Sequence, residues 1–322
     1  MKEHNHSFSR RDFLAMSGTL AAGSILPGKS SSSHESKQDM DPVIDIHQHI
    51  FYVGRTDDQL IHHQKTMGVT HTIMLPAGSV QYTQSTHYGR SNGLQAQAGG
   101  NKSCFDFAQA HAKEFSFAAN EVPDIPDAVK EVEKYLQMGA KMIAEVKFGL
   151  SCDSQELQRF YSLAAEYGVP ILMHWQYETY NYSFPYFYKM LEKYPKTKFI
   201  GHAQTWWANV DKAQQDHPWE MYPNGPVIKG GITDRYLSDY ENMYGDLSAG
   251  SGLNFFRRDE DFTKDFFTRH QDKLLFGSDC SDLVGEGEAC IGAQTIALVR
   301  KLMPKGIERK LLYENAKKMF TL

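Results

Sequence analysis

Side chains that bind divalent metal ions stand at the ends of five short apolar segments of this chain. The segments are IDIHQH (44–49), IAEVKFG (143–149), ILMHWQ (171–176), FIGHAQ (199–204) and LFGSDCSD (275–282). Their candidate ligands are His47, His49, Glu145, His174, His202 and Asp279. Neutral imidazole and carboxylate are the ligands that zinc and similar ions prefer. Because each group ends a segment that is typical of a buried strand, the sequence predicts one converging metal site.

Strands and helices are expected to alternate from Pro42 onward. The predicted strands are mostly apolar and bounded by Gly, Pro or Asp, as strands buried on both faces should be. They span 43–50, 71–76, 115–120, 141–148, 170–175, 198–202, 243–248 and 273–278. Apolar residues at helical spacing predict helices at 124–138, 154–167, 292–303 and 307–320. Eight strand–helix units in one domain, residues 41–322, indicate an α/β fold of the (β/α)8 TIM-barrel type.

This barrel would bring the candidate ligands together at one end. Active sites of such barrels lie at the mouth formed by the C-terminal ends of the strands. His47 and His49 are two residues apart on one strand, so both imidazoles should face the barrel interior. Long connections follow the second and sixth strands, at 78–103 and 205–230. We expect these two loops to stand over the mouth as lids.

The ordered motifs HxH, His, His and Asp resemble those of the amidohydrolase superfamily. The strand details, with Glu-Asn-Ala at 314–316 in the last helix, are most similar to its amidohydrolase-2 branch of metal-dependent TIM-barrel hydrolases and decarboxylases. The resemblance covers residues 42–322. It implies four metal ligands, His47, His49, His174 and Asp279. His202 would then be a second catalytic group or a ligand to a second ion.

The fourth strand leaves two candidates for a further ligand. Binuclear members of the superfamily carry a carboxylated Lys or a Glu here, and IAEVKFG offers both Glu145 and Lys147. The segment AEVKFG resembles one in TatD-like deoxyribonucleases whose Glu is a ligand, so we favour Glu145. Lys147 would then contact a substrate carboxylate or pair with Glu145. Whether the site holds one ion or two remains open at this point.

The ligands predict a hydrolytic chemistry. A divalent ion, expected to be zinc, lowers the pKa of bound water from about 15.7 toward about 7 and polarises a carbonyl or phosphoryl oxygen. Asp279 would accept the proton of that water and pass it to the leaving group, while His202 would polarise the scissile oxygen. Aromatic and polar residues after the strands would form a pocket for a small organic molecule. The predicted substrate contacts are Arg55, Lys147, Trp175, Gln176 and Trp206.

Three functions are compatible with this site. The first is hydrolysis of a C–O or C–N bond in a lactone, ester or amide. The second is non-oxidative decarboxylation of a small carboxylic acid, in which His202 or Asp279 would protonate carbon. The third is a catalytically silent barrel that only binds its ligand. Retention of competent side chains at all five motif positions favours an enzyme over the silent barrel.

Composition excludes some partners. The 322 residues carry a net charge of −5, with 34 basic and 39 acidic side chains. No basic footprint for nucleic acid is present, so a small-molecule substrate is expected. A homo-oligomer is compatible with the sequence. Four cysteines, Cys104, Cys152, Cys280 and Cys290, form no CxxC pair, which excludes a structural zinc ribbon. We expect them to be free, with Cys280 lining the site beside Asp279.

The first 40 residues read as an export signal and linker. Arg10 and Arg11 precede a mildly apolar run at 15–26, and a serine-rich stretch follows at 30–33. A twin arginine before a short apolar run is the address of the bacterial Tat route. The run is too short and too rich in Gly and Ala to span a bilayer. The sequence therefore predicts a periplasmic or otherwise exported protein.

Overall fold

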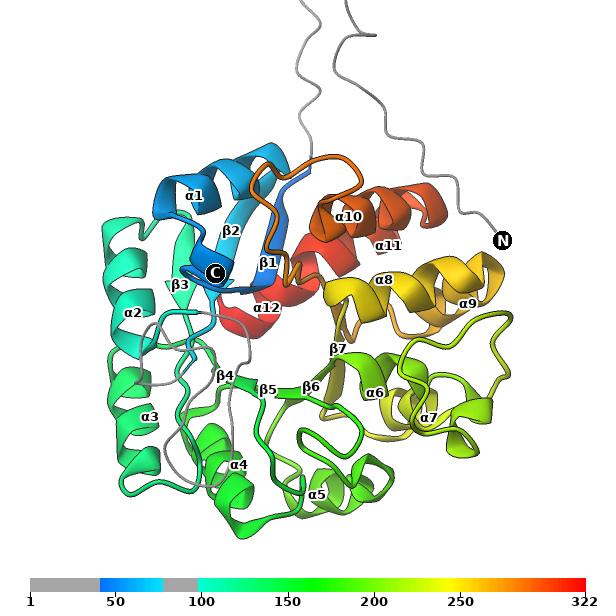
Figure 1. The fold of residues 1–322 in the computed structure, drawn as a ribbon, viewed down its shortest axis with the longest axis horizontal. Coiled ribbons are helices and arrows are strands. Elements are labelled where there is room, and N and C mark those ends of the chain that lie inside the picture. Colours follow the sequence, from blue (N-terminus) through cyan, green and yellow to red (C-terminus); the bar gives the residue numbers. More distant parts are fainter. Residues whose placement is uncertain (1–40, 78–97) are drawn as a thin grey trace, which may run out of the picture. The chain divides into compact units, whose positions relative to one another are not determined.

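The computed structural model describes residues 41–77 and 98–322. In this part of the chain, parallel strands alternate with helices, and the helices lie around the strands (Figure 1). The strands are β1 (Val43–Gln48), β2 (Val69–Met74), β3 (Phe115–Phe117), β4 (Ile143–Val146), β5 (Ile171–His174), β6 (Phe199–His202), β7 (Met243–Asp246) and β8 (Leu274–Leu275). The predicted export signal (1–40) and most of the predicted lid after the second strand (78–97) lie outside the described residues.

All strand pairs are parallel and follow the order of the sequence. One sheet has the order β1-β2-β3, and the other runs from β4 to β8. Backbone hydrogen bonds join the two sheets on both sides, between the β3 and β4 regions and between β1 and the residue after β8. Ala119 forms a bridge with Ile143, and the Ile46 N–H donates to the Phe276 carbonyl at 3.0 Å. The α/β barrel expected from the sequence is confirmed.

The paired strands are shorter than their predicted ranges, except β2, which has the predicted length but begins two residues earlier. The described part of the chain contains the helices α1 (Asp57–Thr66), α2 (Asn101–Ala110), α3 (Ala128–Gln137), α4 (Gln155–Tyr167), α5 (Tyr188–Lys193), α6 (Gln204–Ala208), α7 (Ile232–Asp239), α8 (Ala249–Arg258), α9 (Glu260–Arg269), α10 (Ile291–Leu302), α11 (Lys305–Arg309) and α12 (Asn315–Phe320). The same part of the chain also contains the short helical turns η1 (Tyr52–Gly54), η2 (Phe184–Tyr186), η3 (Lys212–Gln215) and η4 (Lys310–Glu314). The helix predicted at 307–320 is thus divided, because η4 is a π-helical turn between α11 and α12.

Local sequence explains the ends of α4. The Ser154 side chain accepts from the Leu157 N–H, which satisfies one of the free donors of the first turn. Gly168 ends the helix with φ of +66°, a conformation that costs glycine nothing. Phe160 and Ala164 are buried on one face of the helix. Caps and an apolar stripe therefore place α4 as the sequence predicts.

The barrel interior below the mouth is apolar. It is filled by Ile44, Ile46, Ile73, Ala118, Leu172, Ile200 and Leu275, with Ala316 and Phe320 from α12. Strands β1 and β4 each break their pairing register near the mouth, between Asp45 and Gln48 and between Ile143 and Val146. A register break lets two successive side chains face the same side of a strand. Within the described residues, no helix is both long and apolar enough to cross a membrane.

Candidate metal centre

Four side chains from three strand ends surround one small space at the mouth. The Nε2 atoms of His47 and His49 are 3.3 Å apart. Glu145 Oε2 lies 3.8 Å from the first and 3.5 Å from the second, and Asp279 Oδ1 lies 3.7 Å and 3.6 Å from them. Bonds of about 2.0–2.1 Å to a tetrahedral ion place the ligand atoms about 3.3–3.4 Å apart. The two imidazoles and either carboxylate are therefore spaced to bind one divalent ion after small shifts.

The other oxygens of the same two carboxylates face a second pair of imidazoles. Glu145 Oε1 lies 2.5 Å from His174 Nδ1 and 3.5 Å from His202 Nε2. Asp279 Oδ2 lies 3.6 Å from His202 Nε2. Glu145, His174 and His202 together form a second group of side chains that could hold a metal ion. Glu145 thus stands between two groups and presents one oxygen to each.

Hydrogen bonds to Nδ1 hold the imidazoles of His47, His49 and His202 with their Nε2 atoms directed to the carboxylates of the centre. The Nδ1 atom of His47 donates to Asp246 Oδ2 at 2.7 Å, and that of His49 donates to the Leu75 carbonyl at 2.8 Å. His202 Nδ1 pairs with Ser248 Oγ at 2.7 Å. A proton held on Nδ1 leaves the lone pair of Nε2 available. Among the described residues, the buried His202 Nε2 has no hydrogen-bond partner, which fits a metal ligand.

The electrostatics of the centre favour a cation. Burial opposes charge on His47, but Asp279, Asp246 and Glu145 outweigh it and raise the pKa of His47 well above its usual value. Burial, reinforced by His47, holds the pKa of His202 well below its usual value, so this imidazole stays neutral. A proton on His47 therefore balances the buried carboxylates where a metal ion could do the same.

Asp246 and Ser248 complete the centre, and Asp246 was not among the predicted site residues. Both are fully buried at the end of β7, and Ser248 Oγ donates to Asp246 Oδ2 at 2.7 Å. The sequence offers Asp45 as a candidate partner for the imidazoles, although strand parity places it on the same face as His47. The register break in β1 instead directs Asp45 to Ser278 and to the backbone N–H of His47. The acidic end of the predicted strand at 243–248 was the available signal for Asp246.

Asp279 is held from both sides. Its N–H donates to the His47 carbonyl at 2.9 Å, and its φ of +43° lies in the left-handed region that non-glycine residues rarely adopt. The Tyr52 hydroxyl donates to Asp279 Oδ1 at 3.1 Å. The charge of Asp279, together with burial, raises the pKa of Tyr52 well above its usual value, so the phenol stays a donor. Strained backbone of this kind is common at functional sites.

Two predicted substrate contacts lie inside the protein instead. The buried Arg55 donates to the carbonyls of Cys280 and Asp282, both at 3.0 Å, and so ties the segment after β8 to β1. Trp206 is fully buried and its indole lies over Gly201, where a Cβ would come within 2.4 Å of the ring. Both side chains are long enough to reach back from the mouth into the core, which sequence position alone does not reveal.

The other predicted contacts lie beside the mouth. Trp175 and Gln176 line a cavity of about 710 Å³ that none of the six candidate ligands lines. Gln176 Oε1 is 3.4 Å from His174 Nε2, so the cavity wall begins next to the centre. Lys147 Nζ lies 5.4 Å from the ring centroid of Tyr180, another residue of this wall. The cavity after β5 and β6 therefore offers space for a small molecule next to the centre.

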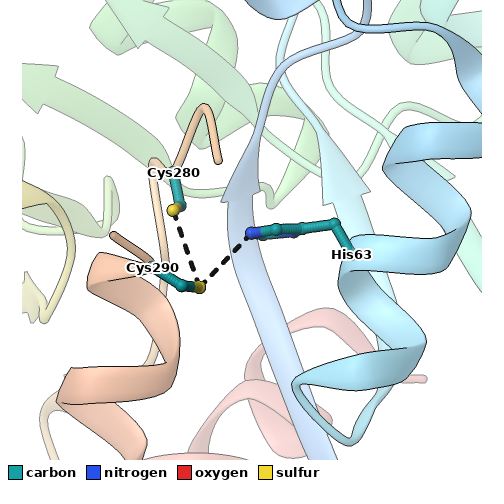
Figure 2. Close-up of side chains that lie close together, drawn as sticks. All are labelled: His63, Cys280 and Cys290. Carbon is teal, nitrogen blue, oxygen red and sulfur yellow. Dashed lines mark hydrogen bonds between the residues drawn. The ribbon is translucent and has the colours of Figure 1, made fainter. Parts of the chain in front are cut away.

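Cys280 does not line the mouth. Its buried sulfur lies 3.8 Å from that of Cys290 and points toward Cys290, as Figure 2 shows. All four cysteines are buried and free, as expected from the sequence. Asp279 contacts the imidazoles of the mouth, whereas the next residue, Cys280, contacts Cys290.

Comparison of the sequence with protein-family models shows the family of the chain. The family model described as amidohydrolase, of the amidohydrolase-2 type, matches residues 44–322. The chain belongs to this amidohydrolase family. The resemblance read from the strand motifs is thereby confirmed. No curated protein matches the amidohydrolase in sequence.

Solved structures resemble the amidohydrolase in fold. An uncharacterised TIM-barrel protein from Bordetella bronchiseptica has a TM-score of 0.59 at 11% identity, over 87% of this chain and 98% of that one. A probable 2-pyrone-4,6-dicarboxylic acid hydrolase from Acinetobacter baumannii has 0.56 at 12%, over 87% and 99%. A 2,6-dihydroxybenzoate decarboxylase from Rhizobium has 0.54 at 11%, over 88% and 99%. At these identities the likeness concerns the fold alone.

Proposed function

We propose that this amidohydrolase hydrolyses a C–O or C–N bond in a small lactone, ester or amide, using one or two divalent ions. The observation that carries the proposal is the position of Glu145. One of its oxygens faces His47 and His49, and the other faces His174 and His202. A carboxylate between two such groups suits a pair of ions that share it, an arrangement typical of metal-dependent hydrolysis.

The residues of the centre then have separable roles. His47, His49, Glu145 and Asp279 would hold one ion, and Glu145, His174 and His202 would hold a second. A bound ion, which we expect to be Zn²⁺, supplies Lewis acidity to water and to the substrate oxygen.

The exposure of Asp279 supports a role in proton transfer. Of the charged ligands it is the partly exposed one, with 14% of its side chain accessible, whereas Glu145 is 2% exposed. Asp279 would accept the proton of the attacking water and pass it to the leaving group. Tyr52 would hold one carboxylate oxygen so that the other remains free to act. His202, neutral at physiological pH, would orient the scissile oxygen if it does not bind an ion.

The cavity beside β5 supports a small organic substrate. Trp175, Tyr180 and Phe184 give it an aromatic wall, and Gln176 and Arg235 add polar groups. Such a mixture binds a ring or short chain with a few polar substituents. Lys147, near Tyr180, would contact a substrate carboxylate. The solved hydrolase of similar fold is named for a dicarboxylic lactone, which agrees with an anionic ring substrate.

Decarboxylation is the second candidate, favoured by one contact. His174 Nδ1 and Glu145 Oε1 are 2.5 Å apart, which is a hydrogen bond and too close for two ligands of one ion. If that bond persists in the metal-loaded protein, Glu145 serves the first ion alone and the second group stays empty. A single ion would then hold the carboxylate side of the substrate, and His202 or Asp279 would protonate carbon. The fold is shared with a solved decarboxylase.

Metal content separates the two candidates. We would measure ions per chain in protein purified without chelator, for the wild type, Glu145→Ala and the control Glu308→Ala. Glu308 is a buried carboxylate on α11, paired with Arg300 and Lys305. A fall from two ions to one or none in Glu145→Ala alone supports the shared site. One ion in all three proteins contradicts it.

Product analysis decides the reaction. A panel of aromatic lactones, esters, amides and carboxylic acids would be incubated with the loaded protein in water enriched in ¹⁸O. Incorporation of the label into product supports hydrolysis, whereas release of carbon dioxide without it identifies a decarboxylase. No turnover of any compound, with ligand binding unchanged in Asp279→Asn, would favour a silent barrel.

We also propose that the amidohydrolase is exported through the Tat route. The support is the twin arginine, Arg10 and Arg11, before the apolar run at 15–26. Tat carries folded proteins, which suits an enzyme that binds its metal before export. Changing both arginines to lysine should retain a tagged chain in the cytoplasm, as fractionation would show. An unchanged distribution would contradict the proposal.

A further inference from the structure

Three further metal-binding side chains meet outside the candidate metal centre (Figure 2). His63 comes from α1, Cys280 from the segment after β8, and Cys290 from the N-cap of α10. Cys290 Sγ lies 3.8 Å from Cys280 Sγ and 3.4 Å from His63 Nε2. All three side chains are buried, with residue exposures of 0 to 1%. The group shares no residue with the six ligands at the mouth.

The connection from β8 to α10 is folded to bring this group together. Asp282 Oδ2 accepts from the N–H groups of Val284 and Gly285, which tightens the loop. Gly285 has a φ of +93°, and a Cβ there would come within 2.3 Å of the His63 carbonyl oxygen. Glycine therefore lets the loop pack directly against α1. Cys290 Sγ accepts from the Ala293 N–H and is held at the start of α10.

The spacing of the three atoms is that of ligands around one ion. Bonds of about 2.3 Å to sulfur and 2.0–2.1 Å to nitrogen at tetrahedral angles separate two sulfurs by about 3.8 Å and a sulfur from a nitrogen by about 3.6 Å. The structure has 3.8 Å and 3.4 Å for these pairs. A disulfide would instead need the sulfurs at about 2.05 Å. The present arrangement is therefore closer to a metal site than to a disulfide.

The imidazole of His63 lacks another strong polar partner in the described part of the chain. Its Nδ1 is buried without a hydrogen bond, and its Nε2 faces the weakly polar Cys290 sulfur. An ion bound to Nε2 would replace this weak contact with a strong one, and Nδ1 would keep the ring proton. A further soft atom is close by. Met67 lies one helical turn after His63, and its Sδ would meet a Cβ built at Gly292 within 2.6 Å.

We infer that His63, Cys280 and Cys290 form a second metal site, which binds a thiophilic d¹⁰ ion, Cu⁺ or Zn²⁺. Thiolate ligands select these ions over Mg²⁺, Ca²⁺ and Mn²⁺, which prefer oxygen. The three donors suffice for Cu⁺, whereas Zn²⁺ in structural sites takes a fourth. Cys280 directly follows Asp279, so an ion here anchors the loop that carries the proposed proton acceptor. The site does not depend on the function proposed for the mouth.

A sulfur-specific signal tests this site in the intact protein. Metal-free, reduced full-length chain would be titrated with Co²⁺, a spectroscopic substitute for Zn²⁺, and separately with Cu⁺ against a chromophoric chelator. The centre at the mouth has no sulfur ligand, so thiolate-to-cobalt charge-transfer absorption reports only a cysteine site. We expect one equivalent of Cu⁺ or of Co²⁺ to be bound with sulfur, and Zn²⁺ to displace the Co²⁺.

Variants locate the signal. Cys290→Ser should abolish the thiolate absorption and weaken Cu⁺ or Zn²⁺ binding at this site at least about 100-fold, because one strong ligand is lost. His63→Gln, which keeps both thiols, should weaken binding in the same direction. Cys104→Ser is the matched control, because Cys104 is equally buried but lies on α2 outside the group. It should retain the absorption and the affinity.

Two results would overturn the inference. One is the absence of sulfur-bound metal in the reduced wild type, or its persistence in Cys290→Ser. The other is a protein whose two thiols are joined in a disulfide as purified and which binds no ion after reduction. Circular dichroism of each variant would show that it is folded. If only one of the two variants folds, that variant decides the result.

Discussion

Asp246→Asn should weaken metal binding at the mouth without unfolding the barrel. Asp246 Oδ2 accepts from His47 Nδ1 and from Ser248 Oγ, both at 2.7 Å. Asparagine keeps one acceptor oxygen for His47 but removes the negative charge that fixes its tautomer. Its amide nitrogen would replace Oδ1, which lies against Gly277 and has no hydrogen-bond partner in the described residues. The substitution therefore acts on the candidate ligand His47 through its hydrogen-bond partner, Asp246.

The magnitude follows from the number of ligands affected. Loss of a carboxylate behind a ligating imidazole typically costs 10- to 100-fold in metal affinity. Because Ser248 links Asp246 to His202 as well, two imidazoles lose part of their support. We expect the upper half of this range, about 30- to 100-fold, or roughly 2–3 kcal/mol. Competition with a chromophoric chelator would measure the affinity, and thermal unfolding of the metal-free protein would measure stability.

Asp45→Asn is the control for burying an amide in place of a carboxylate. Asp45 is also fully buried, but it binds Ser278, Gln64 and the backbone of His47 rather than an imidazole. It should lower the unfolding temperature while leaving metal affinity within about threefold of the wild type, since no ligand changes tautomer. The reasoning is refuted if Asp246→Asn binds metal as the wild type does, or if both variants lose affinity equally.

Three further outcomes are expected. Tyr52→Phe should lower kcat about 10-fold with little change in stability, because Asp279 loses one hydrogen bond; an unchanged kcat would mean that Tyr52 does not position it. Gly201→Ala should cost about 1–3 kcal/mol in denaturant unfolding, because its Cβ meets the Trp206 ring at 2.4 Å. Metal binding to the stripped protein should release protons and strengthen as pH rises, because the raised pKa of His47 keeps a proton there. Titration in weakly buffered indicator would show no release if His47 stays protonated.

The two metal sites would act on one segment from opposite sides. Asp279 faces the mouth, and Cys280 faces His63 and Cys290. Arg55 binds the carbonyls of Cys280 and Asp282 and so holds the same segment to β1. A buried arginine and a buried ion on this segment would limit the motion of Asp279. The contacts of Arg55 with the next residues thus support Asp279 in the left-handed region at the mouth.

The sequence by itself determined the barrel and the identity of the chemical groups at its mouth. Hydrophobic periodicity, turn residues and helix caps are local features of the sequence. The strands of the barrel and helices such as α4 could therefore be predicted from the sequence alone. The convergence of the candidate ligands could also be predicted, because a barrel brings the C-terminal ends of all its strands to one place. His174 and His202, at the ends of β5 and β6, needed no knowledge of packing.

Only the tertiary structure decided what lies behind those groups. Strand parity placed Asp45 beside His47, but a register break in β1 gives that position to Asp246, 199 residues away in the sequence. Arg55 and Trp206 follow strand ends as substrate contacts would, yet packing turns both inward. Cys280 and Cys290 meet His63 only because a loop folds against α1. Such choices depend on contacts between distant segments, whose energies no local pattern contains.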